Sequence, residues 1–76
     1  MAARIDAITS NYGTIIRIDA QTRRGRRWLR AHTDAAGIQS GVETAVDCDH
    51  RYGVEIMQAM IADGLTLQDA ATGRIA

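Results

Sequence analysis

Residues 14–20 read Thr-Ile-Ile-Arg-Ile-Asp-Ala, and this stretch decides the fold because its side chains alternate in character. On one side of an extended backbone fall three apolar side chains, Ile16, Ile18 and Ala20. On the other side fall Ile15, Arg17 and Asp19. β-Branched residues that alternate in this way predict a β-strand with one buried face and one open face.

The chain before this strand supports two interpretations. Asn11-Tyr12-Gly13 predicts a turn. Residues 4–9 are either a short strand that forms a hairpin with residues 14–20 or, with the rest of residues 1–10, a poorly ordered end. At the other terminus we expect residues 72–76 to be poorly ordered as well.

A helix is predicted directly after the strand. Thr22 stands where an N-cap belongs, and residues 23–32 follow it. One face of this helix, at i, i+3, i+4 and i+7, comprises Gly25, Trp28, Leu29 and His32. Glycine inside a helix costs up to about 1 kcal/mol relative to alanine, so we expect Gly25 to permit a close approach to the sheet.

The second half of the chain repeats this plan. Residues 42–48 alternate again and predict a second strand. Its inward side chains are Val42, Thr44, Val46 and Cys48, and its outward side chains are Glu43, Ala45 and Asp47. Asp49 is a natural cap for a second helix over residues 50–63. The apolar stripe of that helix comprises Gly53, Ile56, Met57, Met60 and Ile61.

The end of the second helix leads into a third strand. Gly64 is predicted to occupy the C′ position of the helix. Leu65 and Leu67 are predicted to point inward from a strand that begins at residue 65. The order of elements is therefore β-α-β-α-β, with an extra N-terminal strand if residues 4–9 pair.

This order predicts one α/β domain over residues 1–76, built as a two-layer sandwich. Because each strand has one polar face, both helices should cover the same face of the three-stranded sheet. Right-handed crossovers between strands in sequence order would place them so. The alternative is an α+β arrangement with a mixed sheet, since the connection over residues 34–41 is long enough to let one strand run antiparallel.

Charge is sorted along the chain, and all nine basic side chains are arginines. Residues 1–33 hold seven arginines and two acids, whereas residues 34–76 hold two arginines and seven acids. A net charge of zero therefore conceals halves of +5 and −5. Such asymmetry bears on what a protein touches, although it does not name the partner.

Composition narrows the class of protein. Seventy-six residues with three aromatic side chains are too few for both a core and a roomy apolar active site, so we expect neither an enzyme nor a cofactor. The single Cys48 excludes an internal disulfide and fits a reducing cytoplasm. No apolar run approaches the roughly 20 residues that cross a bilayer, and Arg4 and Asp6 interrupt any signal-peptide stretch. The abundance of arginine without lysine or proline is typical of a GC-rich bacterial genome.

Four short motifs carry a resemblance to a known family. They are Asn11-Tyr12-Gly13-Thr14-Ile15, Thr22 with Trp28-Leu29 six residues later, Arg51-Tyr52, and Gly64-Leu65-Thr66. Over about residues 11–68 the chain resembles a family of short uncharacterised bacterial proteins, frequent in α-proteobacteria and often encoded on plasmids or prophages. The resemblance supports the fold interpretation and implies no chemistry. The chain departs from the family at Arg23-Arg24-Gly25, where the family has an acidic, alanine-rich first turn, so the basic helix is its own.

The first helix also carries the candidate binding site. One stripe comprises Arg23, Arg26, Arg27 and Arg30, with Arg24 beside it. Guanidinium groups stay charged and bind phosphates or carboxylates in a bidentate manner. The alternative interpretation is a solvated face that only keeps a small protein soluble. Because the helix dipole disfavours cations in the first turn, Arg23 and Arg24 imply a partner or an internal carboxylate that offsets them.

Two other clusters predict structure rather than chemistry. Glu43 and Asp47 should form charge pairs with Arg17 across the open face of the sheet rather than act as paired catalytic carboxylates. Asp47-Cys48-Asp49-His50 offers four potential metal ligands in succession, but consecutive side chains at the end of a strand point apart, so we expect no metal site. Cys48 is expected to be a small buried hydrophobe, and His32 a half-buried packing residue.

We therefore expect a small cytoplasmic binding protein, without a membrane segment or a small-molecule ligand. The leading hypothesis is an interaction module whose arginine helix engages an acidic surface on a partner protein or on a second copy in a homodimer. The alternative is a nucleic-acid-binding protein that contacts phosphates through the same helix. The neutral total charge and the acidic half of the chain weigh against the alternative.

Overall fold

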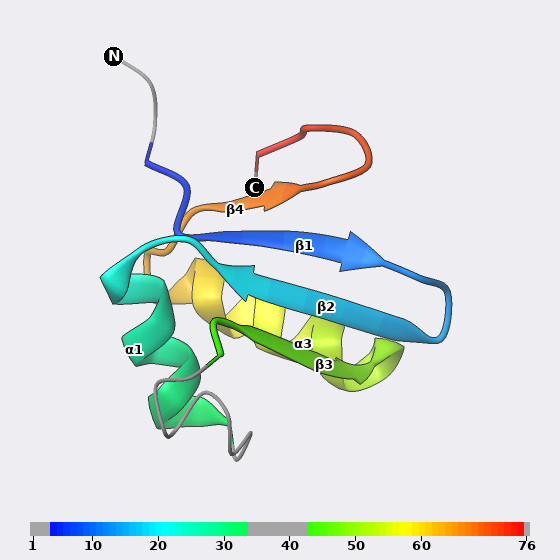
Figure 1. Cartoon of the computed structure of the whole chain (residues 1–76), viewed down its shortest axis with the longest axis horizontal. Coiled ribbons are helices and arrows are strands. Elements are labelled where there is room, and N and C mark those ends of the chain that lie inside the picture. The colour runs from blue at the N-terminus through cyan, green and yellow to red at the C-terminus, as the bar shows by residue number, and fades with distance from the viewer. Residues whose placement is uncertain (1–3, 34–42, 76) are drawn as a thin grey trace.

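In the computed structural model, which describes residues 4–33 and 43–75, the alternating stretch forms a strand in the middle of a four-stranded sheet (Figure 1). The elements in chain order are β1 (Ala7–Asn11), β2 (Ile15–Ala20), α1 (Arg23–His32), β3 (Ala45–Asp49), α3 (His50–Ala62) and β4 (Leu67–Asp69). The strands lie in the order β3-β2-β1-β4, and both helices lie on one side of the sheet. The fold is a two-layer α+β sandwich.

The N-terminal strand exists, and it is an inner strand. β1 pairs antiparallel with β2, so that Asn11 lies opposite Ile16. The turn between them is closed by a 2.8 Å hydrogen bond from the backbone N–H of Tyr12 to the carbonyl of Ile15. Gly13 adopts φ +92°, a left-handed conformation that glycine adopts without strain. The poor order expected for residues 1–10 therefore does not extend to the strand that begins at Ala7.

The sheet is mixed, because β2 runs antiparallel to the strands on both of its sides while β4 runs parallel to β1. The prediction of strands in sequence order is wrong, and the alternative with one antiparallel strand is confirmed. The tight turn joins β1 and β2 as a hairpin, and β4 pairs with the other edge of β1. There the backbone N–H groups of Asp6 and Ala7 donate to the carbonyl of Thr66, at 2.8 and 3.3 Å. The 34–41 connection lies outside the described residues.

Both helices begin at their predicted caps. The hydroxyl of Thr22 accepts from the N–H of Gly25 at 3.0 Å, and the carboxylate of Asp49 accepts from the N–H of Tyr52 at 2.9 Å. α3 ends at Ala62 with Asp63 as its C-cap, and Gly64 follows at the predicted C′ position with φ +88°. One member of its predicted stripe is misplaced, because Ile61 is 41% exposed.

The two helices pack against the same face of β2, as predicted. A Cβ added to Gly53 of α3 would lie 2.8 Å from the Cβ of Ile16, and one added to Gly25 of α1 would lie 3.5 Å from the Cβ of Ala20. Ile16 and Ala20 share one face of the strand, so both glycines bring helix backbone close to that face. The core between the layers comprises Ala7, Ile16, Ile18, Ala20, Trp28, Leu29, Val46, Ile56, Met60, Leu65 and Leu67.

The second predicted strand is shorter than expected. β3 begins at Ala45, and its inward residues are the buried Val46 and the half-buried Cys48. Thr44, predicted to point inward, is exposed because it precedes the strand, and Val42 lies outside the described residues.

Residues 72–75, for which poor order was expected, belong to the described part of the tail. It folds back on the edge of β4, where Gln68 forms a β-bridge with Ile75. The N–H of Asp69 also donates to the carbonyl of Arg74 at 2.8 Å. In the part of the chain that the structure describes, no helix combines the length and apolar character needed to cross a membrane.

Candidate binding surface on helix α1

Five arginines project from α1, and four of them have no polar partner among the described residues. We call Arg23, Arg26, Arg27 and Arg30 the arginine stripe; it extends over about 10 Å of helix. Arg26 is half-buried and the other three are exposed. Within residues 4–33 and 43–75, no side chain forms an ion pair or hydrogen bond with any of the four guanidinium groups.

The arginine stripe lines one open pocket. This arginine pocket has a volume of about 560 Å³, and Thr44 at the approach to β3 completes its lining. The hydroxyl of Thr44 donates a 2.9 Å hydrogen bond to Oδ1 of Asp19. The structure therefore brings four of the five predicted site residues together around one space.

Arg24, the fifth predicted site residue, belongs to a different environment. Its Nη2 donates a 2.5 Å hydrogen bond to the carbonyl of Gly64, just beyond the end of α3. A second open pocket of about 720 Å³ lies on this side of α1, and we call it the tryptophan pocket. Its lining comprises Arg4, Arg23, Arg24, Arg27, Trp28, Ala31, Asp63 and Leu65. Arg23 and Arg27 line both pockets and so separate them.

Trp28 is held rigidly at the tryptophan pocket. Its indole Nε1–H donates a 2.6 Å hydrogen bond to Oδ2 of Asp63, and only 9% of the residue is exposed. His32 stacks on the indole, with ring centroids 4.0 Å apart and planes 13° apart. His32 itself is exposed, so the prediction that it is half-buried is wrong although its packing role is confirmed.

A buried carboxylate lies beneath the first turn of α1. Asp6 is 2% exposed; its Oδ1 accepts from the hydroxyl of Thr22 at 2.7 Å and its Oδ2 accepts from the N–H of Thr66 at 2.9 Å. Burial acts to raise the pKa of Asp6, but these hydrogen bonds and the positive charges of Arg24 and Arg4 outweigh it, so the pKa is lowered. Asp6 is an internal carboxylate of the kind predicted, and it offsets the charge of Arg24 in the first turn.

Sequence reasoning did not single out Asp6 or Arg4. The N–H that fixes Asp6 belongs to Thr66, 60 positions along the chain, and no local spacing reveals such a pair. Trp28 did offer a signal, because a buried indole N–H needs an acceptor. That acceptor proves to be Asp63, the C-cap residue of α3.

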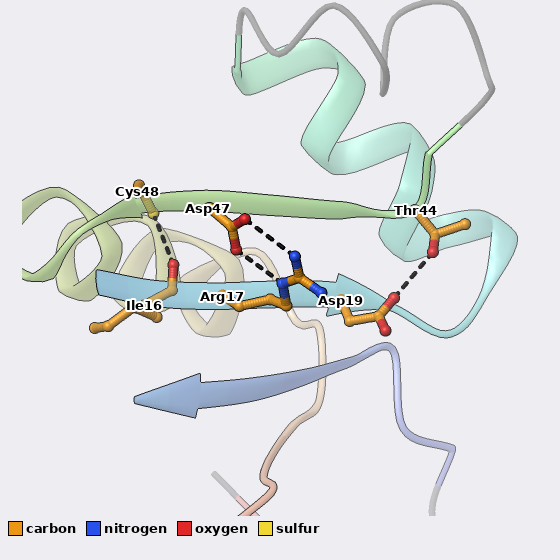
Figure 2. Close-up of polar contacts among 6 residues, drawn as sticks. All are labelled: Ile16, Arg17, Asp19, Thr44, Asp47 and Cys48. Carbon is orange, nitrogen blue, oxygen red and sulfur yellow. Dashed lines mark hydrogen bonds and ion pairs between the residues drawn. The ribbon is translucent and has the colours of Figure 1, made fainter. Parts of the chain in front are cut away.

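The open face of the sheet carries the predicted cross-strand ion pair. Figure 2 shows Arg17 and Asp47 side by side on β2 and β3, where two hydrogen bonds of 2.8 and 3.1 Å join them. The hydrogen bond from Arg17 holds the pKa of Asp47 below its usual value. Glu43 precedes β3 and does not pair with Arg17, so the prediction is wrong for that residue.

Cys48 is half-buried between the sheet and α3. Its thiol lies 3.6 Å from the carbonyl of Ile16, as Figure 2 shows. Burial, and then the negative charges of Asp49 and Asp47, raise the pKa of this thiol. In the described parts of the chain, no three His, Cys, Asp or Glu side chains gather so as to hold a metal ion.

Most of the described carboxylates have internal partners. Those with a hydrogen-bonded carboxylate are Asp6, Asp19, Asp47, Asp49, Asp63 and Asp69. Glu43 and Glu55 are exposed, and no side-chain interaction joins either one to another described residue. The acidic half of the sequence is therefore dispersed, whereas the basic half concentrates on α1.

No protein-family model matches the chain, and neither curated proteins nor solved structures yield a match. The resemblance to short plasmid- or prophage-associated bacterial proteins stays a prediction. What the protein does must be argued from its own surface.

Proposed function

We propose that this domain is a non-catalytic binding module whose α1 helix engages an acidic surface of another protein. One observation carries the proposal: four guanidinium groups line a single pocket without a carboxylate partner among the described residues. Arginine is the side chain best suited to bidentate recognition of carboxylates.

The arginine stripe is unfavourable for the isolated helix. Like charges three and four residues apart destabilise a helix by about 0.2–0.5 kcal/mol per pair. Asp6 offsets the charge of Arg24, but it is buried beneath the N-terminal end of α1. Carboxylates from a partner would reduce the remaining repulsion between the arginines, so that binding an acidic surface would be favourable.

A different protein fits this surface better than a second copy of the chain. Self-association would require an acidic face complementary to the arginine stripe. Glu43 and Glu55 are the described carboxylates that accept no hydrogen bond from another described residue. They stand on different elements, one before β3 and one within α3, so they do not supply such a face.

A protein partner is also preferred over single-stranded nucleic acid. Proteins that bind single strands present aromatic faces on which bases stack. Trp28 is the aromatic residue of α1, and it is almost buried with His32 stacked upon it. Binding to duplex DNA would require only phosphate contacts, and the arginines could make such contacts.

The proposal can be tested with a fluorescein-labelled, glutamate-rich peptide of about 20 residues, followed by anisotropy at 20 mM and 300 mM salt. We expect binding at low salt that weakens at high salt. The double variant Arg26→Ala/Arg30→Ala should lower affinity at least tenfold. The matched control, Arg51→Ala/Arg74→Ala, removes the same charge from residues outside α1 and should change affinity less than threefold.

Three outcomes would contradict the proposal. Equal loss in both double variants would mean that net charge rather than α1 drives binding. Tighter binding of a duplex DNA would assign the surface to nucleic acid, with a slope of about −3.6 for log affinity against log salt concentration if four phosphates are contacted. A salt-sensitive dimer in sedimentation, abolished by the α1 variant, would assign it to self-association.

A further inference from the structure

The two pockets on either side of Arg23 and Arg27 differ in chemistry. The arginine pocket is lined by guanidinium groups and one threonine. The lining of the tryptophan pocket also includes three apolar residues, Trp28, Ala31 and Leu65, which we call its apolar floor. We propose that this floor receives one large apolar side chain, leucine or larger, from the same acidic segment that the arginine stripe binds. The inference rests on the proposed function and specifies the partner.

The floor of the tryptophan pocket is prepared before any partner arrives. The hydrogen bond to Asp63 and the stacked His32 fix the orientation of the indole. Leu65 is 5% exposed and packs in the core. A rigid apolar surface of this kind needs little reordering on binding, so an entering side chain loses less affinity to entropy.

The rim of the same pocket is cationic. Arg24 is anchored to the carbonyl of Gly64 by one of its nitrogen atoms, which leaves its other N–H groups available to a ligand. Arg23 and Arg27 line both pockets, so carboxylates on either side of the apolar side chain would find guanidinium groups. The rim therefore selects acidic neighbours for the apolar residue.

Asp63 makes the floor unsuitable for a second carboxylate. Its Oδ2 is bound to Trp28, and the side chain remains part of the pocket lining. A carboxylate that entered as far as the floor would meet this negative charge. An uncharged apolar group avoids that repulsion and covers the exposed apolar edges. The pocket thus discriminates between positions in an acidic segment, with carboxylates outside and an apolar side chain inside.

The test uses two labelled peptides that carry the same glutamates and differ at one central position, leucine in one and serine in the other. Trp28 is the single tryptophan, so its fluorescence reports directly on the pocket. We expect the leucine peptide to bind at least tenfold more tightly and to shift the Trp28 emission more than the serine peptide does. Ala31→Gln, at an exposed helix position, should remove the leucine preference while affinity for the serine peptide stays within twofold.

Arg30→Ala is the matched control, because Arg30 lines the arginine pocket and not the tryptophan pocket. It should weaken both peptides equally and keep the leucine preference. Equal affinities of the two peptides for the native protein would overturn the inference and leave the proposed function standing. A leucine preference that survives Ala31→Gln would place the apolar subsite elsewhere and overturn it too. Failure of both peptides to bind at low salt would overturn the proposed function itself.

Discussion

The indole N–H of Trp28 on α1 donates a 2.6 Å hydrogen bond to the carboxylate of Asp63, the C-cap residue of α3. This bond joins the two helices at the side where the tryptophan pocket opens. It also places Trp28, the largest side chain of the core, in the lining of the tryptophan pocket.

Trp28 should therefore be the most sensitive position for stability. Trp28→Ala removes a buried indole, and we expect the free energy of unfolding to fall by about 3–5 kcal/mol. Trp28→Phe keeps much of the packing but leaves Asp63 without its donor, so we expect a loss of about 1–3 kcal/mol. Urea denaturation followed by circular dichroism measures both. Equal stability of the native protein and Trp28→Ala would show that the indole does not hold the helices together.

Two helix glycines should resist replacement by alanine. Alanine is the better helix former by about 1 kcal/mol, so an unconstrained site would gain stability. At Gly25 an added Cβ would collide with the carbonyl oxygen of Asp6, and at Gly53 it would lie 2.8 Å from the Cβ of Ile16. A backbone carbonyl and the Cβ of a β-branched residue can move only a little. We therefore expect each substitution to lower the free energy of unfolding by about 1–3 kcal/mol net. A higher melting temperature for either variant would contradict the close approach of helix and sheet.

Asp6 should make the stability of the folded protein sensitive to acid. Its pKa is lowered in the folded state, so the unfolded state, with a pKa near about 3.9, binds more protons as the pH falls. The stabilisation is therefore present above about pH 4 and is lost as the pH falls through the folded value. Asp6→Asn should be less stable at pH 6 and should lose less stability between pH 6 and pH 3. Glu55→Gln, at an exposed site, controls for removal of a carboxyl group. Parallel pH profiles for the native protein and Asp6→Asn would refute the assignment.

Cys48 should react slowly with thiol reagents. Burial and the charges of Asp49 and Asp47 raise its pKa, so little of the reactive thiolate is present at pH 8. We expect alkylation by iodoacetamide, followed by mass spectrometry, to be at least tenfold slower in buffer than in 8 M urea. Equal rates in the two conditions would place the thiol at the open surface.

Met60 and Ile61 are neighbours on α3 that should respond differently. Met60 is fully buried, and Met60→Ala should cost about 2–5 kcal/mol. Ile61 is 41% exposed, so Ile61→Ala should cost less than about 1 kcal/mol. Thermal melts of the pair separate the buried face of α3 from its open face. If the two variants melted together, the rotation of α3 about its axis would be wrong.

Local patterns predicted the elements themselves. The alternation at residues 14–20, the cap at Thr22 and the cap at Asp49 act through neighbours in the chain, and each appears where it was predicted. The sequence patterns gave wrong predictions at the end of an element and at the solvent-exposed edge of a helix face. Thr44 precedes its strand and Ile61 lies on the rim of its stripe, and periodicity does not say where burial stops.

The candidate site was likewise predicted only in part. The spacing of Arg23, Arg26, Arg27 and Arg30 places them on one helix stripe, and they do line one pocket. The tryptophan pocket could not be foreseen, because it needs Arg4 from the N-terminal segment and Asp63 from the end of α3 beside α1.

By itself the sequence determined both helices and the positions of three strands, while leaving β1 open, and it showed where the arginines concentrate, because these properties depend on residues a few positions apart. Only the tertiary structure decided the strand order, the parallel pairing of β4 with β1 and the carboxylate that offsets the first turn of α1. The physical reason is distance along the chain. The contacts of Asp6 with Thr66 and of Trp28 with Asp63 form when the sheet and helices pack, and no short-range pattern encodes them.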